Sequence, residues 1–349
     1  MLLGQATVEE QLNTKGEANF KELPPSFRLS KVHIYLIAPD VEMIEVDKEF
    51  DLSAPVITIR VRPIKESAYK DFRSTIKDKE ISAETSNRPS LVKILPGSFI
   101  MGSPINETSR ETEETQHRVN ISYILFVGST VITQAQYRLV MNEDPVSSRK
   151  TKLGRKCSEM GLGDRYPVVC INWREAIEFC NRLSQVEGLA PAYSVGEKED
   201  VTLNLAATGY RLLTEAEWEF AARARTTSAY WFGGSEAMLS EMAWTRENSG
   251  HIGHPVASKP ANPWGLFEMH GNVWQMTWDL YEEYHATEQT NPLGALVGEL
   301  RIWRGRSWFA PASQARSAYR FRCAMECAYG DLSFRITRTV APIPGEMKQ

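Results

Sequence analysis

Cysteine is the residue type in this sequence with the greatest capacity for redox or metal chemistry. The chain has five, Cys157, Cys170, Cys180, Cys323 and Cys327, and none of them forms a Cys-x-x-Cys pair. An odd number of cysteines, behind an N-terminus that does not resemble a secretion signal, argues against a disulfide framework. We therefore expect reduced thiols in a cytoplasmic protein. Cys323 and Cys327 are close enough for a redox or metal role, although no neighbouring motif supports one.

Histidine and carboxylate patterns give no recognisable catalytic site. One close histidine pair, His251 and His254, lies in a loop rich in Gly and Pro, where a solvated loop is the simpler interpretation. The sequence contains no Gly-x-Ser-x-Gly elbow, no Gly-rich phosphate loop and no His-Glu-x-x-His motif. The acidic residues are too dispersed to predict a pair that would do general acid–base work.

Composition excludes several classes of protein. The chain has 349 residues, 42% of them apolar and 24% charged, as is usual for a soluble globular protein. A net charge of −4 gives no reason to expect nucleic acid as a partner. No apolar run approaches the ~18 residues of a membrane helix, so we expect no membrane span.

Two regions of different composition must position these residues. Residues 1–28 are predicted to be a flexible arm, and residues 29–88 a small β-rich module and linker, with strands over 32–37 and 56–61 and some helix within 66–88. Beyond this point Gly, Pro and Trp become frequent. Capping boxes there predict three helices, which begin after Thr133, Asn172 and Thr214.

Ordered motifs in the second region resemble one family. They are Leu95-Pro-Gly-Ser-Phe-Ile-Met-Gly-Ser103, Gly209-Tyr-Arg-Leu-Leu-Thr-Glu-Ala-Glu-Trp-Glu-Phe-Ala-Ala-Arg223, Asn262-Pro-Trp-Gly-Leu-Phe-Glu-Met-His-Gly-Asn-Val-Trp274, Arg304-Gly-Arg-Ser-Trp308, and Arg316-Ser-Ala-Tyr-Arg320 with Leu332-Ser-Phe-Arg335. This region resembles the sulfatase-modifying-factor, or formylglycine-generating-enzyme, domain. The resemblance implies an α+β, C-type-lectin-like fold with little regular secondary structure over residues 89–340, followed by a tail, 341–349.

The resemblance also implies where an active site would lie. The oxidases of this family use two cysteines that bind copper, and thiolates suit Cu(I) because both partners are soft. The matching positions here are Ala310 and Ala315. Since alanine can neither ligate copper nor form a covalent intermediate, the chain is expected to lack this activity. The alternative is a copper-dependent oxidase with a non-standard site, for which Cys323 and Cys327 are the candidates.

One ion site is implied by the same resemblance. The family binds calcium at a turn, and the matching positions here are Glu268, Gly271, Val273 and Gln275. Oxygen ligands suit calcium, but Gln275 replaces a glutamate and so removes a charge. We expect at most one bound calcium ion, and no cofactor that the protein requires.

The C-terminal segment is unusual for this family because it has no Asn. The last Asn of the chain is Asn291, and positions that are Asn in ordinary family members carry Phe, Ala, Ser, Cys, Tyr and Asp. Changing only the adenines of an AAC codon produces each of these residues. This pattern resembles the variable proteins of diversity-generating retroelements. A near-copy of the codons for residues 303–338, beside a reverse transcriptase gene, would support that interpretation; ordinary drift is the alternative.

These observations predict a non-catalytic ligand-binding protein. Its variable surface would be formed by about residues 303–331 and would take a protein or a small molecule. The predicted ligand-binding residues are Trp303, Trp308, Phe309, Ala310, Ala312, Ser313, Ala315, Tyr319, Phe321, Cys323, Cys327, Tyr329 and Asp331. The N-terminal module is expected to act as a tether or to contact a partner. A structural scaffold subunit is the remaining alternative.

Overall fold

The computed structural model describes residues 17–21, 56–60, 88–196 and 200–339. Contacts within the chain divide it into two compact units, Met1–Ser82 and Ala83–Gln349.

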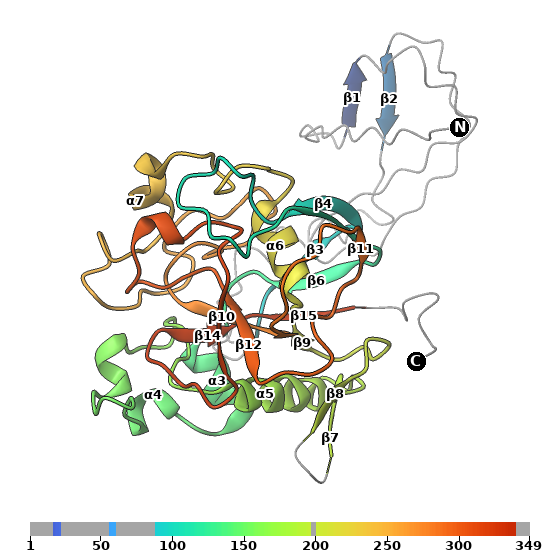
Figure 1. Ribbon diagram of the computed structural model, residues 1–349. Helices are drawn as coiled ribbons and strands as arrows, with labels where there is room; N and C mark the ends of the chain where they lie inside the picture. The colour runs from blue at the N-terminus through green and yellow to red at the C-terminus, as the bar shows by residue number, and fades with distance from the viewer. Residues whose placement is uncertain (1–16, 22–55, 61–87, 197–199, 340–349) are drawn as a thin grey trace. The chain divides into compact units, whose positions relative to one another are not determined.

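The first unit contains one described pair of strands. Strand β1 (Glu17–Lys21) pairs antiparallel with β2 (Val56–Arg60) (Figure 1). β2 confirms the strand predicted over 56–61. β1 lies within the segment predicted to be a flexible arm, so that prediction is wrong for these five residues. The predictions for 32–37 and 66–87 lie outside the described residues.

The second unit combines short strands with few helices, as predicted (Figure 1). Its strands are β3 (Leu91–Ile94), β4 (Gly97–Met101), β5 (His117–Ile121), β6 (Leu125–Gly128), β7 (Tyr193–Val195), β8 (Val201–Leu203), β9 (Arg211–Leu212), β10 (Trp274–Leu280), β11 (Gln289–Thr290), β12 (Leu300–Arg304), β13 (Phe321–Ala324), β14 (Leu332–Phe334) and β15 (Ile336–Arg338). Its helices are α3 (Gln134–Met141), α4 (Pro145–Ser148), α5 (Trp173–Val186), α6 (Glu215–Arg223) and α7 (Leu239–Met242), with 3-10 turns η1 (Cys157–Met160), η2 (Glu236–Met238) and η3 (Ala312–Gln314).

One four-stranded sheet contains both strands that the C-terminal segment contributes, β12 and β13. Its strand order is β13-β12-β10-β14. β12 pairs antiparallel with both β13 and β10, while β14 runs parallel to β10. In this register Trp303 lies opposite Phe321 on one side and Met276 on the other. The sheet therefore brings together residues that are far apart in the sequence.

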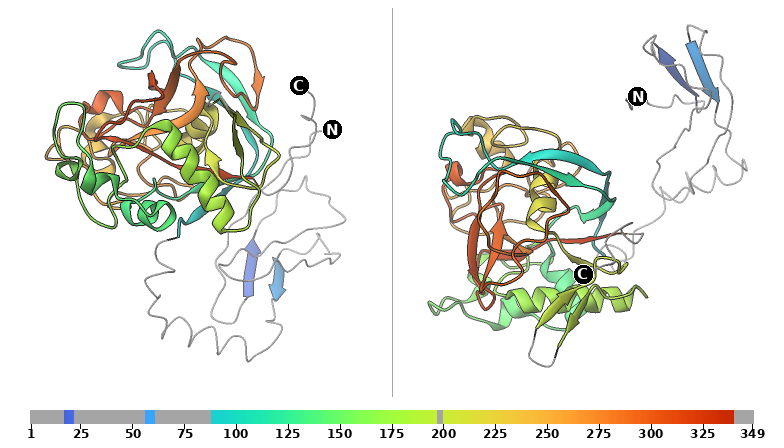
Figure 2. Two further views of the ribbon diagram at one scale, coloured as in Figure 1. Left: turned by 90° about the horizontal axis from the view of Figure 1, so that it is seen from below. Right: turned by 45° about the vertical axis from the view of Figure 1, so that its right-hand side comes forward.

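All three helices predicted from capping boxes are present. Thr133, Asn172 and Thr214 each accept a hydrogen bond from the backbone N–H three residues later, and the side chain of that third residue accepts one from the backbone N–H of the cap. The sequence did not predict the four-residue helices α4 and α7. The long helix α5 packs beside α3 and β9 and lies across one side of the unit (Figure 2).

Helix α6 is buried although it is rich in charge. Glu217 forms two hydrogen bonds with Arg211, at 2.6 and 2.7 Å, and Glu219 pairs with Arg223 at 2.8 Å. Glu215 and Glu219 also pair with Arg304 of β12. Buried charges are stable only when they are paired. The charged motif around this helix thus fixes it against the sheet that carries the C-terminal segment.

The structure pairs four of the five cysteines, so the prediction of reduced thiols is wrong for these four. Cys157 is bonded to Cys170, and Cys323 to Cys327, while Cys180 is a buried free thiol. The prediction failed because it used the number of cysteines, whereas pairing depends on which cysteines the fold brings together. The predicted cytoplasmic location was linked to reduced thiols, so it loses that support and stays a prediction.

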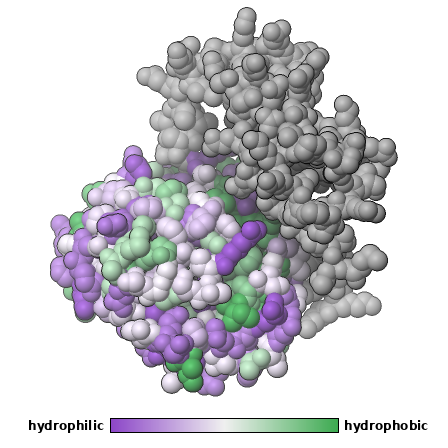
Figure 3. All heavy atoms as spheres, turned by 90° about the horizontal axis from the view of Figure 1, so that it is seen from above, coloured by the Kyte–Doolittle hydropathy of each residue, from purple (hydrophilic) through white to green (hydrophobic). Residues whose placement is uncertain are grey.

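The surface is polar, with scattered apolar residues. On the face shown in Figure 3, hydrophilic residues surround small hydrophobic areas. Within the described residues, no helix is both long and apolar enough to span a bilayer.

Candidate functional site

Aromatic rings form a connected cluster on the sheet of β13, β12 and β10. Trp274 stacks on Phe321 with ring centroids 5.3 Å apart, and Trp303 lies 5.7 Å from both Phe321 and Tyr329. Tyr319 lies 6.2 Å from Trp274. Such ring pairs add stability beyond their buried area. The cluster therefore gives the C-terminal segment a rigid base.

Three aromatic side chains of the segment are exposed. Phe309 is 63% exposed, and Phe321 and Tyr329 are each 39% exposed. Phe309 lies against Trp308, at 5.7 Å between centroids, and Trp308 itself is buried. Exposed aromatic rings held on a buried base can bind a ligand at a low cost in conformational entropy. We call these three side chains the aromatic anchors.

Polar contacts hold the backbone beneath the anchors. Ser307 donates its hydroxyl proton to Asp331 over 2.6 Å, and burial raises the pKa of the Asp331 carboxyl. The backbone N–H of Trp308 donates to the Asn272 carbonyl, and that of Trp274 to the Asp331 carbonyl. These bonds tie both ends of the segment to the turn before β10.

The other predicted ligand-binding residues are either buried beneath the surface or only partly exposed on it. The buried ones are Trp303, Trp308, Ala310, Ala315, Tyr319 and Cys327. Partly exposed positions are Ala312, Ser313, Cys323 and Asp331. The sequence could not separate these groups because an aromatic or small side chain fits either environment.

The two alanines at the family's cysteine positions are both buried. Ala315 packs in an apolar cluster with Ala229 and Tyr230, and its carbonyl accepts a hydrogen bond from His270. The Ala310 carbonyl accepts from the backbone N–H of Arg246. The side chains at these positions are methyl groups, which cannot ligate copper.

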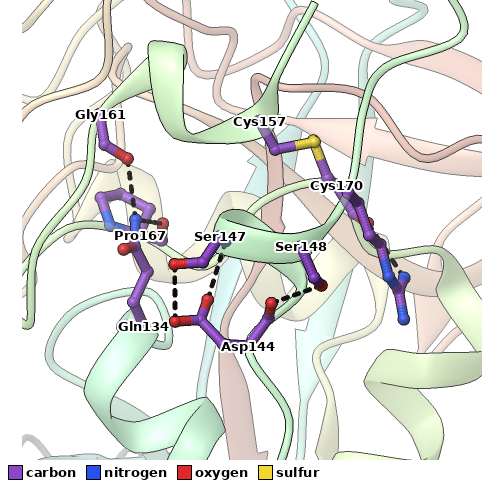
Figure 4. The surroundings of a disulfide bond; sticks show 9 residues. Gln134, Asp144, Ser147, Ser148, Cys157, Gly161, Pro167 and Cys170 are labelled. Carbon is purple, nitrogen blue, oxygen red and sulfur yellow. Dashed lines mark hydrogen bonds between the residues drawn. A yellow bond between two sulfur atoms is a disulfide. The ribbon is translucent and has the colours of Figure 1, made fainter.

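The alternative copper ligands, Cys323 and Cys327, are bonded to each other. In this state neither sulfur is a thiolate, the form that binds metal. Their segment lies beside the first disulfide, because Cys170 donates its backbone N–H to the Tyr329 carbonyl. Figure 4 shows the Cys157–Cys170 bond with the helix α4 and its cap, Asp144, nearby.

Gln275 does not fit the calcium site implied by the family. Its side-chain oxygen accepts hydrogen bonds from Trp218 (3.0 Å) and Arg335 (2.9 Å), which occupy both lone pairs. Its amide nitrogen donates to the Glu268 carbonyl at 2.6 Å. The predicted set, which also includes Gly271 and Val273, therefore lacks one of its ligands.

Glu268 is the remaining acidic group at that turn. One carboxylate oxygen accepts the Ala257 backbone N–H, and the other is buried without a hydrogen-bond partner. Burial raises the pKa of this carboxyl to about 7. Calcium binding through Glu268 and backbone carbonyls alone stays a prediction.

The sequence missed two residues at this surface, Trp274 and Arg306. Trp274 contacts three of the predicted rings from outside the segment, and Arg306 lies over both Trp274 and Tyr319. Trp274 belongs to a family motif outside the segment 303–331, so the sequence assigned it no place at this surface. The one signal at Arg306 was its place between Gly305 and Ser307, which says nothing about what its side chain contacts.

The fold and these motifs define a family. The Sulfatase-modifying factor enzyme 1-like domain matches residues 77–340, more than half of the chain, and the chain belongs to this family. The predicted family resemblance is thereby confirmed. Among characterised relatives, the chain is 27% identical to the chaperone protein LppX of Paenibacillus barcinonensis over 245 residues, covering 61% of this chain and 80% of that protein.

A second relative is the inactive C-alpha-formylglycine-generating enzyme 2 of Bos taurus. It is 24% identical over 316 residues, covering 85% of this chain and 84% of that protein. The match spans less than half the length of the mouse and bovine formylglycine-generating enzymes, at 39% and 46%.

A solved structure extends the comparison to variable proteins. Treponema denticola variable protein 1 superposes with a TM-score of 0.64 at 27% identity, covering 72% of this chain and 95% of that chain. Together with the mixed α+β architecture, this confirms the predicted fold class and the predicted resemblance to variable proteins.

Proposed function

We propose that this chain is a non-catalytic binding protein whose segment 303–331 forms a variable ligand-binding surface. The observation that supports this most is the exposure of Phe309, Phe321 and Tyr329 above a base of buried rings. A surface that binds through exposed side chains on a fixed backbone can accept many residue sets without unfolding.

Two further observations favour binding over catalysis. Ala310 and Ala315 stand where the family's oxidases have cysteines, and the similarity to a variable protein and to an inactive enzyme points the same way. The ligand is a protein or a small molecule, and the N-terminal module serves as a tether or contacts a partner.

Peptides selected from a displayed random library against the full chain provide a probe for this proposal. Phe309→Ala with Tyr329→Ala should weaken the affinity of a selected peptide by about tenfold or more, because truncating each anchoring ring costs about 1–2 kcal/mol. Calorimetry on the wild type and the double variant measures the loss. The melting temperature should change little, since both side chains are exposed.

The matched control replaces two exposed apolar residues outside the segment. Leu296 and Val297 are 91% and 84% exposed. Leu296→Ala with Val297→Ala should leave peptide affinity unchanged. The proposal is wrong if the double variant in the segment binds as well as the wild type, or if the control loses as much affinity.

A further inference from the structure

The guanidinium of Arg306 is the group at this surface best placed to recognise a charged ligand. We infer that Arg306 forms an oxyanion subsite, so that the ligand carries a carboxylate or another flat oxyanion next to an apolar group that contacts the aromatic anchors. This inference rests on the proposed function and specifies the chemistry of its ligand.

Arg306 differs from the other arginines of the sheet and its surroundings because it has no partner. Arg304, Arg316, Arg320 and Arg322 all pair with glutamates at hydrogen-bonding distance. Within the described residues, no hydrogen bond or ion pair joins Arg306 to the protein, and its buried Nε atom lacks an acceptor. Because only Nε is buried in this way, the two terminal nitrogens reach solvent.

Aromatic rings hold this guanidinium in place. Its central carbon lies 4.7 Å from the centroid of Trp274 and 4.8 Å from that of Tyr319. A planar guanidinium packed against two rings has lost rotational freedom before any ligand arrives, and its fork of donors matches a carboxylate in two parallel hydrogen bonds. The backbone at Arg306 has φ of 65°, where side chains other than glycine are uncommon.

Desolvation supplies the reason why an anion would bind here. Partial burial lowers the pKa of Arg306, which means that the protein does not fully compensate its charge. The charge of Asp331 acts on Arg306, but Asp331 forms no ion pair with it and accepts the Ser307 hydroxyl instead. A ligand oxyanion would provide the missing partner for a charge that is already partly desolvated.

The position of the subsite also defines what must accompany the anion. Phe321 stacks on Trp274, the same ring that Arg306 contacts, and Phe321 is partly exposed. A ligand that pairs with Arg306 can therefore place an apolar group against Phe321. This combination describes an acidic residue beside an aromatic or aliphatic one, or a small aromatic acid.

Saturation-transfer NMR on the full chain tests the inference with 4-phenylbutyrate as the probe and 4-phenyl-1-butanol as its neutral match. The acid should receive several times more saturation than the alcohol. Arg306→Gln should reduce the signal of the acid to that of the alcohol. Inorganic phosphate, which is tetrahedral and not flat, should displace the acid poorly, and displacement at equal concentration would contradict a subsite for flat oxyanions.

Arg322→Gln is the matched control, because Arg322 is a nearby, partly exposed arginine that already pairs with Glu113. This variant should bind the acid as the wild type does. Arg306→Lys keeps the positive charge but lacks the planar fork of donors, so it should bind the acid weakly. This conservative variant distinguishes the loss of a recognition group from misfolding of the chain. Equal saturation of acid and alcohol, or an undiminished signal in Arg306→Gln, would overturn the subsite. Peptide binding through Phe309 and Tyr329 would stand in that case, so the two proposals fail separately.

Discussion

His270 shows at the scale of one residue how a buried group hydrogen-bonded to Ala315 affects stability. The ring is buried, its Nδ1 donates to the Ala315 carbonyl at 2.7 Å, and its Nε2 accepts the Trp231 backbone N–H at 3.4 Å. Both nitrogens are used only when the imidazole is neutral. Burial accordingly lowers the pKa of His270 to about 4.

A pH dependence follows from this shift. Between pH 6.5 and about 4 the unfolded chain binds a proton at His270 and the folded chain does not, so this residue lowers stability as the pH falls. At pH 5 the loss amounts to about 2 kcal/mol relative to pH 7. His270→Asn keeps a donor toward Ala315 but does not titrate. Denaturant unfolding of both proteins should show that their difference in stability shrinks as the pH falls.

The acidic groups whose pKa is raised act in the opposite sense and are common to both proteins; they are Glu107, Glu268, Asp279 and Asp331. Comparing the variant with the wild type at each pH therefore isolates the histidine. A difference that stays constant between pH 7 and pH 5 would contradict a neutral His270.

Single residues also show where sequence information ends. The types of Phe309, Tyr329 and Trp308 suggested binding anchors, and the structure exposes the first two but buries the third. Exposure depends on neighbours distant in the sequence, such as the turn at Asn272 that holds Trp308. Arg306 was missed for the same reason, since the rings it contacts, Trp274 and Tyr319, are not its neighbours in the sequence.

At the scale of elements, prediction succeeded where the signal is local. A capping box needs only four consecutive residues, and all three boxes mark the start of a helix. The four-residue helices α4 and α7 are too short to show a helical period. Cysteine spacing does not say which thiols the backbone brings to bonding distance, so the pairings of Cys157 and Cys323 became visible only in the structure.

Both disulfides constrain the segment that carries Tyr329. Cys323 and Cys327 close a short loop within it, and Cys170 of the other disulfide donates its N–H to the Tyr329 carbonyl. Cys170 has φ of 60°, an uncommon value that its disulfide and its hydrogen bonds hold in place. The hydrogen bond from Cys170 thus connects the segment 321–331 to the first disulfide.

Opening the first disulfide should loosen the anchors that depend on it. In Cys157→Ala with Cys170→Ala, amide hydrogen exchange in residues 321–331 should become about tenfold faster or more. The reason is that a disulfide that closes a loop of this length contributes about 3 kcal/mol to the stability of the folded state in the entropic view. Exchange in helix α6, which is held by its own ion pairs, should change less. Mass spectrometry of peptides from the full chain measures both.

Cys180→Ala provides the control, since Cys180 is buried but bonded to no other cysteine. Its exchange pattern at 321–331 should match that of the wild type. Equal protection of 321–331 in all three proteins would show that the hydrogen bond from Cys170 does not need the disulfide.

At the scale of the whole molecule, the structure separates a fixed frame from an exposed surface. Buried pairs such as Arg211–Glu217 and Arg304–Glu219 connect helix α6 to the strands beside it. The family motifs contain these residues, whereas the exposed anchors lie between motifs. This division explains why the sequence identified the fold more completely than the ligand.

The division of the chain at Ser82 gives the last prediction. The unit Ala83–Gln349 contains its own apolar clusters, its disulfides and all the residues of the proposed surface. Residues 83–349 alone should therefore unfold cooperatively, at a temperature close to that of the corresponding transition in the full chain, as calorimetry would show. Selected peptides should bind this fragment and the full chain with equal affinity. Loss of peptide binding in a fragment that remains folded would instead place the partner site in the N-terminal module, as the scaffold alternative requires.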